Sequence, residues 1–314
     1  MRIVQALALL LLCALPSCDG PGALGSGGAR APAPPRFDAG MPGETAALSD
    51  PLWDDGKAEV AGYVTREARY GTLRDGEAVL ITVKETFDAE QLVKADAPEP
   101  PQYPLTVMKL NRLVTVPTGV YTYRQMTSTF LEREDAQPVK LSVSSQEWCG
   151  TTAKRLEVHG DSAFLRAFSY FGAEGQRAWP VPMDERTVLA DALPLWLRTL
   201  DLDRRGERRV RIVDEQMSNR ARPPHARDAV INVGTPGSIA VPAGTYDAVP
   251  VVVTRGDREE TFWLQKDRPH TFVRWDRADG GVYWLRYVER AFYWKMNGVE
   301  DVGAIDPARR SRGG

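Results

Sequence analysis

The sequence predicts a mainly β protein of curved antiparallel sheets with one helix. Two observations lead to this fold class: short apolar runs that alternate with polar residues, and turn-forming residues between those runs. Arg209–Ile212 alternates with a period of two, and Val249, Val251 and Val253 fall on one face of another strand. Further strands are expected over Glu77–Val83, Phe262–Leu264, Thr271–Trp275 and Val282–Trp294, with turns at 267–269 and 279–281.

One segment has helical periodicity. Leu189, Leu193, Trp196 and Leu200 recur at helical spacing behind Asp184, which can serve as an N-cap. The spacing predicts a single amphipathic helix near 184–200 that lies on the sheet. Because Pro194 lacks a backbone N–H, we expect a kink or an early break there.

A short sequence occurs twice with small changes. Residues 116–121 (VPTGVY) resemble residues 241–246 (VPAGTY), and each stands between two strand-like runs. The proline and glycine predict a type II turn in each, with a positive φ at Gly119 and Gly244. Either one favourable turn has been used twice, or the chain contains two related β-lobes. In the second case the N-terminal lobe covers 51–158 and the C-terminal lobe, with the helix, covers 159–306.

The N-terminus has the features of an export signal. Residues 1–17 carry a positive charge at Arg2 and an apolar stretch from Ile3 to Leu15, which is shorter than the roughly 20 residues that span a bilayer. The stretch ends in Leu15-Pro16-Ser17-Cys18, which resembles the lipobox of bacterial lipoproteins. That resemblance implies cleavage before Cys18, a diacylglycerol on its sulfur and a fatty acid such as palmitate on its amine. The alternative is an ordinary signal that leaves a secreted protein without a lipid.

The segments that flank the folded region have the composition of disordered chain. Residues 18–50 are mostly Gly, Ala and Pro without apolar periodicity, which predicts a tether. Residues 307–314 form a short basic tail, also expected to be disordered. The folded region is therefore expected to cover residues 51–306.

Composition and motifs argue against several classes of function. The net charge of −2 does not favour nucleic acid as a partner. Cys149 is the only cysteine left in the mature chain, so we expect no internal disulfide and no cysteine-based zinc site. Because Trp148 precedes it, we expect Cys149 to be a buried, unreactive core residue with no lowered pKa. We find no catalytic motif, no paired histidines and no cofactor motif, so we predict no catalytic residue, no metal and no cofactor.

Aromatic residues are dense near the C-terminus. Ten of the 27 aromatic residues lie within Phe262–Trp294. Strand alternation sends adjacent rings to opposite faces, so one face can form core while the other meets the helix, the other lobe or a ligand. Core packing accounts for the pattern, and a ligand groove is the alternative. In that alternative the contacts are Trp263, Trp275, Trp284, Tyr287 and Trp294.

The second half of the chain resembles a domain family of unknown function found in bacterial periplasmic proteins and lipoproteins. The resemblance rests on residues 194–200 (PLWLRTL), 241–247 (VPAGTYD) and 262–267 (FWLQKD). The first half is similar to uncharacterised bacterial envelope proteins through residues 53–59 (WDDGKAE), 76–81 (GEAVLI) and 144–150 (SSQEWCG). The match of the first half implies a curved antiparallel sheet with a helix on one side, as in periplasmic lipoprotein carriers.

Two functions follow as hypotheses. In the first, the chain is exported and anchored by its lipid to the bacterial cell envelope, where it acts without catalysis as a binding or structural module. Its partner is then an apolar small molecule, a glycan or another envelope protein. In the second, it is a cell-envelope hydrolase whose site cannot be recognised from motif spacing.

Overall fold

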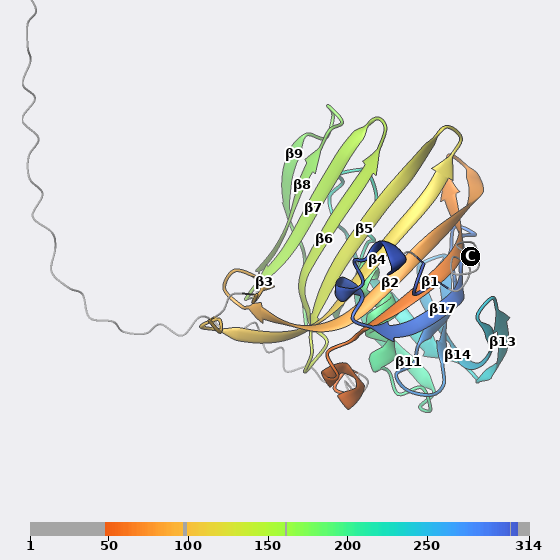
Figure 1. The fold of residues 1–314 in the computed structure, drawn as a ribbon. Coiled ribbons are helices and arrows are strands. Elements are labelled where there is room, and N and C mark those ends of the chain that lie inside the picture. Colours follow the sequence, from red (N-terminus) through yellow and green to blue (C-terminus); the bar gives the residue numbers. More distant parts are fainter. Residues whose placement is uncertain (1–47, 97–98, 161, 302, 307–314) are drawn as a thin grey trace, which may run out of the picture. The chain divides into compact units, whose positions relative to one another are not determined.

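Almost all of the folded chain is β-strand in the computed structural model, which describes residues 48–96, 99–160, 162–301 and 303–306. All of these residues belong to one compact unit. Seventeen strands form one sheet (Figure 1). They are β1 (Ala58–Arg69), β2 (Thr72–Asp88), β3 (Val93–Lys94), β4 (Pro104–Thr118), β5 (Tyr121–Glu132), β6 (Pro138–Glu147), β7 (Gly150–His159), β8 (Ser162–Ser169), β9 (Gln176–Pro180), β10 (Thr187–Leu189), β11 (Gly206–Val213), β12 (Ala226–Val233), β13 (Gly237–Val241), β14 (Gly244–Arg255), β15 (Arg258–Gln265), β16 (Phe272–Asp276) and β17 (Val282–Ala291).

The predicted fold class is confirmed, because every strand pair is antiparallel except β10 with β11. From one edge the strands run β9, β8, β7, β6, β5, β4, β2, β1. They continue through β17, β16, β15, β14, β12, β11 and β10. The short strands β3 and β13 add to β2 and β14.

The sheet does not divide at residue 158, where the boundary between two lobes was expected. Strands β8 and β9 lie beyond that residue, yet β8 pairs along the whole of β7 and β9 pairs with β8. The two halves of the chain meet at β1, which pairs with β2 on one side and β17 on the other. Gly62 lies at a register shift in this second pairing, and a Cβ there would come within 2.1 Å of the Tyr287 ring.

The repeated sequence forms two hairpins that differ in register. Gly119 has φ 75° and Gly244 has φ 134°, so the positive φ predicted for each glycine is confirmed. In the first hairpin Thr118 pairs with Tyr121, which places Pro117 in the strand and Gly119 in the loop. In the second hairpin Val241 pairs with Gly244, so Pro242 and Ala243 form the loop. The prediction of two equivalent type II turns was therefore wrong, because the loops are offset by two residues in the repeat.

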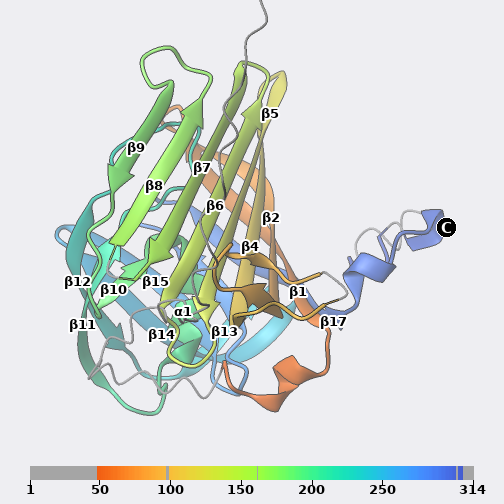
Figure 2. The same ribbon diagram turned by 90° about the vertical axis from the view of Figure 1, so that its left-hand side faces the viewer.

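The sheet curves around a short helical segment (Figure 2). This segment consists of the 3-10 turns η3 (Ala190–Ala192) and η4 (Leu197–Thr199) with the α-helical turn α1 (Leu193–Trp196) between them. Its ten residues are all buried, and its apolar side chains share one core cluster with inward-facing residues of the sheet. Further 3-10 turns are η2 (Pro51–Asp54), η5 (Tyr293–Lys295) and η6 (Val299–Asp301).

The expected helix over 184–200 was wrong in extent and in kind. Strand β10 occupies Thr187–Leu189, and Asp184 accepts hydrogen bonds from Arg186 N and the Thr187 hydroxyl instead of capping a helix. The segment is buried on all sides because most of its residues are apolar and its two charged residues, Asp191 and Arg198, form buried ion pairs. Pro194 stands in the first turn of α1, where no helical N–H bond is lost.

The folded core includes a residue that precedes residue 51. Leu48 is fully buried in the main core, so the predicted tether ends earlier than expected. The rest of the tether, the signal and Cys18 lie outside the described residues, as does the basic tail. No helix among the described residues has the length and apolar character needed to cross a membrane.

Candidate functional site

Exposed aromatic side chains gather at one end of the curved sheet. The hairpin turns β1–β2, β4–β5 and β6–β7 meet there, and the loop 214–225 between β11 and β12 lies beside them. Tyr70 is 66% exposed and Trp148 is 77% exposed, which is unusual for residues of this size. A site that presents such rings to solvent is a candidate for ligand recognition.

Four aromatic residues form a contiguous group, which we call the aromatic rim: Tyr70, Tyr121, Tyr123 and Trp148. The Tyr70 hydroxyl lies 2.7 Å from the Tyr121 hydroxyl and 2.6 Å from that of Tyr123. The ring of Trp148 lies 6.3 Å from that of Tyr121. Burial is the main cause that raises the pKa of Tyr123, so its hydroxyl is protonated at neutral pH.

The backbone at Tyr70 is unfavourable for a tyrosine. Tyr70 and Gly71 form the two-residue loop between β1 and β2, since Arg69 pairs with Thr72. Tyr70 has φ 53°, where such hairpins ordinarily place Asn, Asp or Gly. Leu92, Ala136 and His270 also have a positive φ, and Tyr70 carries the largest side chain of the four.

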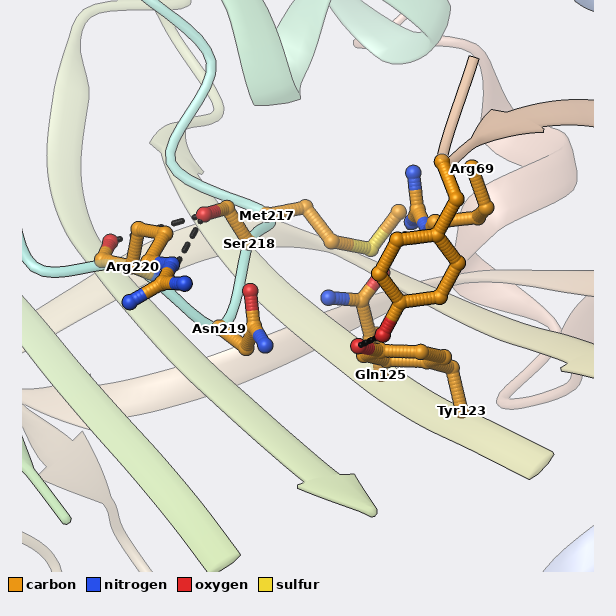
Figure 3. Close-up of a pocket in the computed structure, with 8 residues that line it drawn as sticks. Arg69, Tyr123, Gln125, Met217, Ser218, Asn219 and Arg220 are labelled. Atoms are coloured by element: carbon orange, nitrogen blue, oxygen red, sulfur yellow. Dashed lines mark hydrogen bonds between the residues drawn. The ribbon is translucent and has the colours of Figure 1, made fainter. Parts of the chain in front are cut away.

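A pocket of about 210 Å³ lies between the aromatic rim and the 214–225 loop (Figure 3). Its lining combines aromatic rings with guanidinium, carboxamide and hydroxyl groups. The lining residues are Arg69, Tyr70, Tyr123, Gln125, Met217, Ser218, Asn219 and Arg220.

The polar wall of this pocket is held in place by hydrogen bonds from the sheet. Arg69 donates to the Gln125 side-chain oxygen over 2.6 Å, and Gln125 donates to the Ser145 hydroxyl over 3.1 Å. The Arg69 guanidinium also lies 5.7 Å from the centre of the Tyr123 ring. These contacts fix two planar polar groups beside an aromatic face before any ligand arrives.

The opposite wall is the 214–225 loop, which side chains hold in place. Thr152 donates to Asn219 O over 2.9 Å, and Lys154 donates to Gln216 O over 2.7 Å. Asp191 accepts from Gln216 N over 2.7 Å. The loop is thus attached to β7 and to the helical segment through polar groups.

A second hollow, of about 310 Å³, lies between β17 and the C-terminal segment. Its charged side chains bind one another: Arg286 contacts Glu77 over 3.1 Å and Asp306 over 2.6 Å. Since exposed aromatic rings lie beside the pocket at the aromatic rim, that pocket is the candidate site.

Cys149 was expected to be buried, and this was wrong. It lies exposed in the β6–β7 turn beside the aromatic rim. A hydrogen bond from the thiol to Glu147, together with the charge of that carboxylate, raises the pKa of Cys149. The expectation that the pKa of this thiol is not lowered is therefore confirmed. His159 stands at the far end of β7, roughly 30 Å away at the usual rise per residue, so it cannot act as a base for this thiol.

The structure does not bring the five C-terminal aromatic candidates together. Trp275 is packed in the core and stacks on Phe262. Trp263 is half-buried and donates to Asp276, while Trp284 is half-buried with the Arg66 guanidinium 5.9 Å from its ring centre. Tyr287 lines the second hollow, and Trp294 is exposed in the 3-10 turn η5.

The aromatic rim was missed in the sequence because its members come from three separate hairpins. The signal that could have found it is local: Tyr70 precedes Gly71 between two strands, so a large ring is carried at a hairpin tip. No protein-family model, curated protein or solved structure matches the chain.

Proposed function

We propose that this protein is a lipid-anchored component of the bacterial cell envelope that binds a glycan at the aromatic rim without catalysing a reaction. The observation that supports the binding role is the exposed rings of Tyr70 and Trp148 beside a polar pocket. The anchor rests on Leu15-Pro16-Ser17-Cys18 and on the resemblance to envelope lipoproteins.

The chemistry of the pocket favours a sugar over the other two partners considered. A sugar ring packs its C–H face on an aromatic ring, while its hydroxyls exchange hydrogen bonds with carboxamide and guanidinium groups. Arg69, Gln125 and Asn219 supply such groups next to Tyr123. An apolar cargo would instead need an apolar cavity, and here the helical segment packs against the inward-facing apolar residues of the sheet.

Fluorescence titration tests this proposal, because Trp148 is exposed and its emission should change on binding. The probes are soluble peptidoglycan fragments and lipopolysaccharide. We expect saturable binding in the wild type and a roughly tenfold weaker affinity in Trp148→Ala, equivalent to about 1.4 kcal/mol for a lost ring contact.

The matched control is Phe168→Ala, which removes a 53% exposed ring on β8 that is not a member of the aromatic rim. It should bind as the wild type does. Equal binding by wild type and Trp148→Ala, or no binding of either probe, would contradict the proposal. Release of shortened glycan products would instead support the hydrolase, the second candidate function.

A further inference from the structure

A cluster of charged side chains lies inside the curve of the sheet, next to the 214–225 loop. Arg112 on β4 is fully buried, and Arg277 follows β16 with 11% of its side chain exposed. Both arginines bind Glu215, which belongs to the loop. Arg277 holds this carboxylate with two nitrogens, at 2.8 and 3.3 Å, while Arg112 Nη2 contacts Glu215 Oε1.

An aromatic ring fixes the two arginines. The Arg112 guanidinium lies 5.4 Å from the centre of the Trp275 ring, and that of Arg277 lies 4.5 Å from it. Burial opposes the charge on Arg112, but the neighbouring carboxylates, Glu215 first, outweigh that effect and raise its pKa. Both guanidinium groups therefore stay charged and are pre-organised to hold an anion.

The cluster has more hydrogen-bonding groups than the protein satisfies. Arg112 Nε and Nη1, Thr127 Oγ1 and Trp275 Nε1 are buried and have no hydrogen-bond partner among the described residues. Thr127 pairs directly with Arg112 across β4 and β5, so these groups lie next to each other. Buried hydrogen-bond donors are ordinarily paired with acceptors. These unpaired groups therefore indicate a site that can bind further hydrogen-bond acceptors.

Glu215 lies on the solvent side of this charged cluster. Its side chain is 26% exposed, whereas Arg112 behind it is not exposed at all. The charges of Asp191 and Glu215 both act on Arg112 and on Lys154, and those of Glu215 and Glu67 act on Arg277. If Glu215 moves out, both arginines lose their shared carboxylate. Arg112 then keeps its 3.4 Å contact with Asp191, and Arg277 keeps its 3.5 Å contact with Asp279.

We infer that Arg112 and Arg277 form a carboxylate-binding site, and that Glu215 occupies it as an internal substitute for the carboxylate of a ligand. A ligand enters by displacing the Glu215 side chain, which is the partly exposed member of the cluster. The inference goes beyond the glycan proposal and does not depend on it, because it concerns a different set of residues and a different chemical group.

The test is chemical rescue by acetate, which is the smallest carboxylate that resembles the lost side chain. Glu215→Ala should be less stable than the wild type, and acetate should raise its melting temperature in a saturable way. Acetate should act on the wild type only at roughly tenfold higher concentration, because Glu215 competes for the site. Chloride at equal ionic strength and neutral acetamide are the controls for salt and for shape.

Two further variants test whether the rescue depends on the arginines and on this particular carboxylate. Adding Arg277→Gln to Glu215→Ala should abolish the rescue, and Glu207→Ala, which removes an exposed carboxylate of β11, should show no acetate effect. If Glu215→Ala does not fold, Glu215→Gln keeps the hydrogen-bonding shape, and acetate binding to it is measured by calorimetry. No acetate effect beyond chloride in either variant, or rescue that survives Arg277→Gln, would overturn the inference.

Discussion

Arg198 and Glu59 form a buried, two-pronged ion pair that joins the helical segment to the first strand of the sheet. Arg198 Nη1 lies 2.7 Å from Glu59 Oε1, and Nη2 lies 3.0 Å from Oε2. Arg198 Nε also donates to Pro269 O, and the guanidinium lies 5.2 Å from the centre of the Trp53 ring. One side chain thus connects the helical segment to the N-terminal turn, β1 and the β15–β16 connection.

Removing one partner of this pair should be costly. We expect Glu59→Ala to lower the free energy of unfolding by about 3–5 kcal/mol, because it leaves the Arg198 charge buried without its carboxylate. Denaturant titration measures this. The control is Asp75→Ala, which breaks the exposed pair with Arg66 and should change stability by about 0.5 kcal/mol or less. Equal effects of the two substitutions would contradict a special role for the buried pair.

The two glycines of the repeated hairpins should resist replacement for a conformational reason. Gly119 and Gly244 have positive φ, and a Cβ at either would meet no atom within 4 Å. Gly119→Val or Gly244→Val should therefore cost roughly 1–2 kcal/mol through backbone strain alone. Gly237→Val is the matched control, since that position is equally open and lies outside the left-handed region. A cost at Gly237 as large as at the other two would show that strain is not the cause.

Cys149 should react with thiol reagents in the folded protein. Because it is exposed, we expect the native and unfolded chains to be labelled at similar rates at high pH. Near neutral pH labelling should be slow, since the hydrogen bond to Glu147 and the charge of that carboxylate raise the thiol pKa. Glu147→Gln should lower this pKa and speed labelling at pH 7. A native rate far below the unfolded rate at every pH would show that the thiol is shielded.

Lys154 should make stability depend on pH in the alkaline range. Burial lowers its pKa from 10.5 to about 8. Below pH 8 the side chain is charged in both states, and its burial destabilises the fold. Between pH 8 and 10.5 the folded state loses this proton first, so stability rises with pH by up to about 3 kcal/mol.

The comparison that isolates this effect is Lys154→Met, which keeps the apolar stem but cannot titrate. The stability of the wild type relative to the variant should increase across that window and be constant below it. A difference that falls with rising pH would mean that Lys154 is stabilised as a cation, contrary to the direction of its pKa shift.

Replacing Cys18 should separate the protein from the membrane. We expect Cys18→Ser to appear in the soluble fraction, because the lipid on its sulfur is the proposed anchor. Membrane fractionation together with mass spectrometry of the mature N-terminus measures this. A mutant that stays in the membrane with the mass of the wild type would contradict lipidation.

Alternation along strands was the part of the fold that the sequence could predict. Val249, Val251 and Val253 are all fully buried, as their spacing requires. The helical segment could not be predicted correctly, because its charged residues, Asp191 and Arg198, are buried in ion pairs and do not mark a face toward solvent. Enclosure depends on how the sheet curves around it, which is a property of the whole chain.

The site was harder to predict for a related reason. Tyr70, Tyr121 and Trp148 are far apart in the sequence and meet only because alternate hairpins turn at the same end of the sheet. Cys149 was expected to be buried from its neighbour Trp148, but both lie in a hairpin turn, where side chains reach solvent. Local composition cannot show which hairpin tips are neighbours.

The place of β1 sets an order for folding. Strands β4 to β9 each pair with the preceding or following neighbour in the chain, so that part of the sheet can form from local contacts. One edge of β1, however, must wait for β17, whose residues come more than 200 positions later. Until then the exposed edge is open to pairing with other chains. The pairing of β1 with β17 therefore closes an edge that would otherwise be available for association between unfinished chains.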